Sequence, residues 1–267
     1  LHLRVARTLA KDDDAGGHIF DATNHYNLGA SLIETAQERT AAAALNVKAC
    51  TLALQSSAFG KALEFAEAGM GLLGDDAWQA QRGMALQLAR LQADSAQLNG
   101  RYDDATALLE TAFEHAKSPP ERAELYNLRM QIHGRTGESG KAIDTGIAAL
   151  AELFGFEQPT SPQGWMAAMG QEMQGLQAAL GKRDPMELLD APMLRDPAVF
   201  LQMRTLTAMV GPAYTRMEVL PFVVMRMVRL SVEHGTSPFS PLGYMTYAVL
   251  LCARGMIPPG ARFGELA

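Results

Sequence analysis

One short signal recurs three times in the chain and constrains its fold more than any other feature. A small turn residue stands five positions before an alanine, and another small residue follows that alanine seven positions later. Small residues let a chain reverse and let two helix axes approach closely. The pattern therefore predicts a row of helical hairpins. Its copies are Ser57, Ala62 and Gly69; Gly100, Ala105 and Ala112; and Gly137, Ala142 and Ala149.

The period of the signal is close to that of a known repeat. The three alanines lie 43 and 37 residues apart, against roughly 34 residues for a tetratricopeptide repeat. At these residues the chain resembles tetratricopeptide repeats in which the first helix of each hairpin is lengthened.

Four further motifs are spread over almost the whole chain. They are His-Ile-Phe-Asp-Ala-Thr-Asn-His-Tyr-Asn-Leu-Gly at 18–29, Leu98-Asn99-Gly100, Ser237-Pro238 and Arg262-Phe263-Gly264. With these motifs the sequence is similar to the helical region of large bacterial signalling proteins that join a kinase-like domain and a predicted ATPase to sensor and output domains. The resemblance implies a region that binds a partner or ligand and couples the ATPase to an output such as a histidine kinase.

We therefore expect an all-α fold, a right-handed superhelical array of antiparallel helix hairpins in the manner of a solenoid. Residues 1–33, interrupted at Asp12–Gly17, lead into the array. Residues 34–156 form three regular hairpins, and residues 157–267 form divergent Met-rich hairpins of which the last is truncated. The expected pairs are Glu34–Ser56 with Ala58–Leu73, Asp76–Asn99 with Arg101–Ala116, Pro119–Thr136 with Ser139–Phe154, Ala198–Val210 with Glu218–His234, and Pro241–Arg254 with Pro259–Ala267.

The C-terminal part is distinguished by its methionines, because 12 of the 15 in the chain lie beyond Phe154. We expect them to fill an irregular core, with an adaptable docking face as the alternative. One apolar stripe is predicted on a helix at Ser161–Leu180. Four arginines nearby are interpreted as solvated helix flanks. The stripe is Met166, Met169, Met173, Leu176 and Leu180, and the arginines are Arg204, Arg216, Arg226 and Arg229.

Composition narrows the classes of function. Apolar residues make up 48% of the chain, which suffices for a packed core, and the net charge of −6 argues against a nucleic-acid partner. Cys50 and Cys252 form no disulfide framework, and neither a signal peptide nor an apolar run of about 20 residues is visible. These features predict a cytoplasmic protein without a membrane partner.

The sequence contains no recognisable catalytic constellation, so we expect no enzyme activity in this region, no cofactor and no metal. The stretch Gly134–Lys141 superficially matches a phosphate-binding loop, but Arg135 replaces a required glycine and Ala142 the hydroxyl residue. His18 and His25, seven residues apart, have no nearby cysteine or further histidine to complete a metal site.

Seven polar residues are candidates for a binding groove. Repeat proteins usually bind along the concave surface made by the first helix of each hairpin. Placing the repeat signals in register directs these residues toward that surface, with ordinary solvated polar residues as the alternative. They are Gln87, Arg90, Asp94, Gln97, Glu124, Asn127 and Gln131.

Three functions follow as hypotheses. The first is the sensor or scaffold region of a signalling protein, which binds a protein, a peptide or neighbouring domains of its own chain, with a small-molecule inducer as a further candidate. The second is a free-standing adaptor that binds peptides. The third is an all-helical enzyme, which requires a deep pocket with convergent polar groups.

Overall fold

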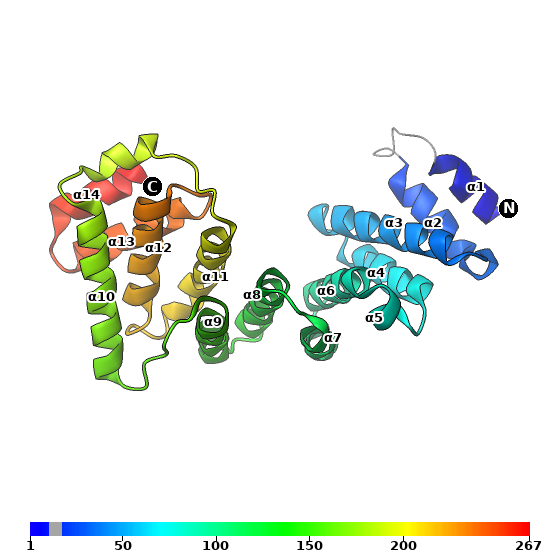
Figure 1. Cartoon of the computed structure of the whole chain (residues 1–267), viewed down its shortest axis with the longest axis horizontal. Helices are drawn as coiled ribbons and strands as arrows, with labels where there is room; N and C mark the ends of the chain where they lie inside the picture. The colour runs from blue at the N-terminus through cyan, green and yellow to red at the C-terminus, as the bar shows by residue number, and fades with distance from the viewer. Residues whose placement is uncertain (11–17) are drawn as a thin grey trace. The chain divides into compact units, whose positions relative to one another are not determined.

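The computed structural model describes residues 1–10 and 18–267. Among these residues the regular structure is helical and no strand is present beyond one isolated bridge, which confirms the all-α prediction. The predicted interruption at Asp12–Gly17 lies outside the described residues. The chain divides into two compact units, Leu1–Ser118 and Pro119–Ala267 (Figure 1). The three ranges expected from the repeat pattern stay a prediction, because this division rests on spatial contact alone.

The first unit contains the first two regular hairpins. The second hairpin departs from expectation at its start, because Gln81 interrupts the helix predicted over Asp76–Asn99. The helix that begins at Ile19 ends at Leu28, and a short 3-10 helix follows it. The elements are α1 (His2–Leu9), α2 (Ile19–Leu28), the 3-10 helix Ala30–Leu32, α3 (Ala36–Gln55), α4 (Phe59–Leu73), α5 (Ala77–Ala80), α6 (Arg82–Leu98) and α7 (Tyr102–His115).

The second unit begins with the third regular hairpin and continues through the Met-rich part. Its helices start and end within a few residues of the predicted ranges. The elements are α8 (Pro119–Arg135), α9 (Ser139–Phe154), α10 (Pro162–Leu180), the 3-10 helix Pro185–Asp190, α11 (Pro197–Ala213), α12 (Leu220–His234), α13 (Ser240–Ala253) and α14 (Ile257–Leu266).

The same turn geometry closes all three regular hairpins. The turn residues Ser57, Gly100 and Gly137 have φ values of 60°, 78° and 77°. After each of them, the next backbone N–H bonds to the carbonyl five residues earlier, at 2.8–2.9 Å, as in a Schellman motif. The left-handed conformation suits glycine, since a side chain there approaches the following carbonyl.

A fourth copy of this turn joins α13 to α14. Gly255 has a φ of 77°, and the Met256 N–H bonds to the Leu251 carbonyl at 3.0 Å. Gly260 takes the place of the alanine five positions later, where a Cβ would lie 2.5 Å from the Cys252 sulfur. The sequence pattern did not reveal this copy because glycine replaces its alanine.

The small residues of the three copies lie at close contacts between helices. All the alanines among them have no measurable exposure, and Gly69 is buried. A Cβ at Gly69 would lie 2.7 Å from a Leu88 methyl carbon and 3.0 Å from the Cβ of Asn46. Helices α3, α4 and α6 therefore meet there at a distance that only a small residue permits.

Replacing Gly137 with alanine is expected to lower the free energy of unfolding by about 1 kcal/mol, because alanine is strained at positive φ. The control is Gly140→Ala in the first turn of α9, where a Cβ would meet nothing within 4 Å. That substitution should stabilise by about 0.5–1 kcal/mol through helix propensity. Urea unfolding of both variants measures the difference, and shifts in the same direction would contradict the turn geometry.

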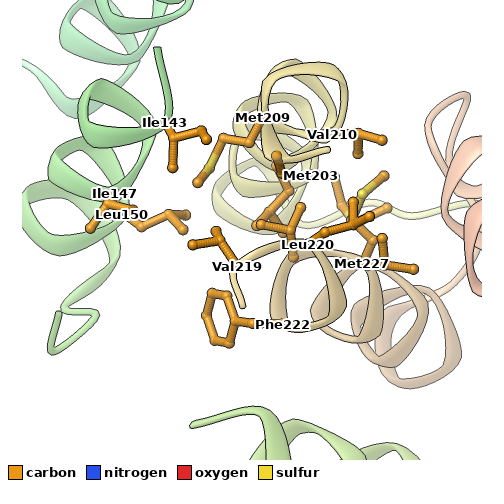
Figure 2. Close-up of a cluster of buried hydrophobic side chains, with 14 of the residues drawn as sticks. Ile143, Ile147, Leu150, Met203, Met209, Val210, Val219, Leu220, Phe222 and Met227 are labelled. Carbon is orange, nitrogen blue, oxygen red and sulfur yellow. The ribbon is translucent and has the colours of Figure 1, made fainter. Parts of the chain in front are cut away.

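A large core lies in the second unit and takes buried residues from α8 to α12, most of them from α9, α11 and α12 (Figure 2). Ile143, Ile147 and Leu150 project from α9 toward the side chains of α11 and α12. Met203 and Phe222 meet them from those two helices and are at most 1% exposed. The third regular hairpin and the Met-rich part thus share one continuous core.

Methionine takes two different positions in this unit. Met203, Met209 and Met227 are fully buried, as predicted for core residues. Met166 and Met245 are instead 67% and 50% exposed, so the core prediction is wrong for them. The difference lies in which face of each helix meets a neighbour.

Candidate functional site

The four candidate groove residues of the first unit lie along one side of α6. Gln87 is exposed, whereas Arg90 and Asp94 are half-buried. Gln97 is only 1% exposed and donates from Nε2 to Asp94 Oδ1 at 3.0 Å. The expectation that Gln97 lies open to solvent is therefore wrong, because it follows the buried Ala93 by one helical turn.

The remaining three candidates lie on α8 in the second unit. Gln131 is exposed, and the half-buried Glu124 lies 3.6 Å from Arg204. Asn127 is only 3% exposed, so its predicted place in an open groove is wrong. It lies between Ala123 and Met130 on a stripe of i, i+4 and i+7 positions, and that spacing is the signal of a buried face. Binding by the other candidates stays a prediction.

A polar cavity of about 520 Å³ opens in the second unit. Its walls come from the connection between α9 and α10, from the first half of α10 and from two side chains of α12. Gly155, with φ of 65°, ends α9, and the Ser161 hydroxyl caps α10 by accepting from the Gly164 N–H at 3.1 Å. The charged lining residues are Glu157, Glu172 and Arg226.

Glu172 forms the centre of an ion-pair cluster beside this cavity. Its side chain is 7% exposed and faces two arginines of α12. Arg229 donates from Nε to Oε2 at 2.7 Å and from Nη2 to Oε1 at 3.3 Å, whereas Arg226 makes one bond, from Nη1 to Oε1 at 3.2 Å. Arg229 also donates to Glu233 at 3.4 Å. Two guanidinium groups thus share one buried carboxylate.

Two further elements hold the Arg226 guanidinium in place. With its amide oxygen turned toward Arg226, Gln202 of α11 accepts from Nε at 3.0 Å and from Nη2 at 2.9 Å. The rings of Phe156 and Phe222 lie 5.9 and 5.8 Å from the guanidinium carbon. Burial lowers the pKa of Arg226 below its ordinary value, with the Glu172 carboxylate opposing that shift.

The interpretation of these arginines as solvated flanks is wrong for Arg226 and Arg229, whose side chains are 16% and 25% exposed. The predicted stripe on α10 is also displaced by about one residue. The buried residues of α10 are Trp165, Glu172 and Leu176, while Met166 faces solvent. Glu172 lies four residues before Leu176 and three after Met169, so its place on this helix face was visible in the sequence. A carboxylate on an apolar face does not, however, identify its partners.

No three His, Cys, Asp or Glu side chains in 1–10 and 18–267 lie close enough together to hold a metal ion. Burial raises the pKa of the Cys50 thiol to about 11, so it stays protonated at neutral pH and is a poor nucleophile. No helix in this described part has the length and apolar character needed to cross a membrane.

The glycine-rich stretch at Gly134–Lys141 contains the hairpin turn between α8 and α9. Lys141 forms an ion pair with Glu138, whose other carboxylate oxygen lies 3.0 Å from His133 Nδ1. The hydrogen bond from Lys141 is the main cause that lowers the Glu138 pKa below its ordinary range. The lysine thus has a carboxylate partner within its own turn.

Comparisons of the chain with protein-family models, with curated proteins and with solved structures found no match in any of the three.

Proposed function

We propose that this chain is a non-catalytic sensor or scaffold region of a signal-transduction protein. It binds a protein, a peptide or a neighbouring domain of its own chain and couples an ATPase module to an output domain. The observation that supports this proposal is the repetition of one hairpin turn with a buried small residue five positions later. It occurs after α3, α6 and α8, and again after α13.

The repetition favours a tetratricopeptide-like solenoid as the finer architecture within the all-helical fold. In such an array each hairpin buries apolar surface against its neighbours, and exposed polar residues on the first helices remain available for recognition. Gln87 of α6 is an exposed member of that set. We place the protein in the cytoplasm, where signalling modules of this kind act.

The experiment introduces Gln87→Arg into the full-length protein. Output activity in response to stimulus should fall at least about fivefold, because a buried unpaired charge disfavours docking. The free energy of unfolding should change by no more than about 0.5 kcal/mol, as is usual for surface substitutions. The control is Gln55→Arg at the exposed end of α3, which should leave both quantities unchanged.

Normal signalling by the stable Gln87→Arg variant would remove α6 from the proposed binding surface. The coding sequence on either side of the chain tests the class of protein. A kinase-like domain and an ATPase before it, with an output module after it, would support coupling. A start and a stop codon close to Leu1 and Ala267 would favour a free-standing adaptor instead.

A further inference from the structure

We propose that the cavity beside Arg226 binds the carboxylate group of a small organic acid. This inference rests on the proposed function and deepens it, because it gives the chemical class of a small-molecule inducer. The cavity of about 520 Å³ has the size of a small-ligand site. Its occupant is inferred from three properties of the walls: available donors, charge and shape.

The Arg226 guanidinium has more N–H donors than its partners in the cluster use. A guanidinium carries five N–H groups in a rigid fork that matches a carboxylate. Among the described residues, Glu172 engages one of them through Nη1, and Gln202 engages one each on Nε and Nη2. Two N–H groups on the terminal nitrogens of this cavity-lining side chain remain for a ligand.

The pairing of charges in the cluster leaves Arg226 less neutralised than Arg229, which also bonds to Glu233. Both oxygens of Glu172 already accept hydrogen bonds, and Arg229 takes the shortest of these bonds, at 2.7 Å. Arg226 is left with one bond of 3.2 Å to a carboxylate that it shares. A second carboxylate would therefore complete the neutralisation of Arg226. A cationic ligand would find the oxygens of Glu172 occupied.

The shape of the site indicates an acid with a flat apolar body. Phe156 and Phe222 lie with ring centroids 4.7 Å apart, and both rings lie near the Arg226 guanidinium. The N-terminal end of α10, at Ser161 and Gly164, also lines the cavity and adds a partial positive charge. Two lining carboxylates oppose the ligand: Glu172, whose charge the two arginines offset, and Glu157, which is exposed.

Trp165 provides a direct readout of binding. It is 5% exposed and its ring centroid lies 6.1 Å from that of Phe156 and 5.7 Å from that of Phe222. The only other tryptophan is Trp78, in the first unit. In a Trp78→Phe background, emission therefore comes from Trp165 alone.

The experiment titrates this protein with benzoate, with benzylamine as a cationic probe and benzamide as a neutral one. Benzoate is expected to change Trp165 emission saturably, and the other two are not. Arg226→Lys keeps the charge but loses the fork, and should weaken benzoate at least about tenfold. Glu157→Gln removes the exposed opposing charge and should tighten benzoate binding by about twofold to fivefold.

Several results would overturn the proposal. One is the absence of a saturable signal with benzoate up to about 50 mM, where a site with a millimolar dissociation constant would be filled. Saturation by benzylamine instead, or benzoate affinity unchanged in folded Arg226→Lys, would do the same. Should Arg226→Lys fail to fold, unchanged or weaker binding by Glu157→Gln at the exposed rim decides against it. A negative result here leaves the signalling test at Gln87 untouched, so the two proposals fail separately.

Discussion

Replacing Glu172 with glutamine is expected to lower the free energy of unfolding of the second unit by about 3 kcal/mol. The carboxylate is 7% exposed and accepts three hydrogen bonds from Arg226 and Arg229. Glutamine has nearly the same shape but no charge, so two largely desolvated guanidinium groups lose their shared partner. Removing one partner of a buried ion pair is strongly destabilising for this reason.

Urea unfolding monitored by Trp165 in the Trp78→Phe background measures this loss within the second unit. The matched control is Glu233→Gln, since Glu233 is 31% exposed and makes one bond of 3.4 Å to Arg229. That variant should change stability by no more than about 0.5 kcal/mol, as for an exposed ion pair. Equal midpoints for the two variants would mean that Glu172 is more hydrated than its contacts indicate.

Replacing Gly235 with alanine is expected to destabilise the second unit by about 3 kcal/mol or more. Gly235 follows α12 with φ of 104° and ψ of 170°, a region that is almost confined to glycine. A Cβ there would lie 2.2 Å from the Pro192 carbonyl oxygen, which accepts the Thr236 N–H at 2.9 Å. Because the obstacle is backbone, a side-chain rotation cannot relieve it.

The control for this prediction is Gly255→Ala. Gly255 has φ of 77°, but a Cβ there would meet nothing within 4 Å. Its replacement should therefore lower stability by about 1 kcal/mol, the cost of the left-handed backbone alone. The difference between the two variants measures the contact between the residue after α12 and the segment that precedes α11. Equal losses would show that this contact yields easily.

Local signals in the sequence were sufficient for most of the helices and turns, although not for the interruption at Gln81. A small turn residue and an alanine five positions later predicted the hairpins closed at Ser57, Gly100 and Gly137. These features act within a few residues, because helical hydrogen bonds and turn geometry join near neighbours in the chain. The same locality explains the missed copy at Gly255, whose turn is identical although its alanine is replaced.

Burial of polar groups was decided by the tertiary structure. Asn127 and Gln97 looked like groove residues, and Arg226 and Arg229 like solvated flanks, yet each is buried or largely buried. The partner of both arginines is Glu172, which lies more than 50 residues earlier and on another helix.

Helical periodicity indicates which residues share a face, but it does not say what covers that face. On α10, a stripe through Met166 and one through Trp165 differ by one position, and both contain apolar residues. Packing of α10 against α12 selected the stripe that contains Trp165, Glu172 and Leu176. The sequence by itself therefore determined where the chain is helical and where it turns. The tertiary structure alone decided which carboxylate meets which arginine, because that pairing depends on the desolvation of groups brought together from distant parts of the chain.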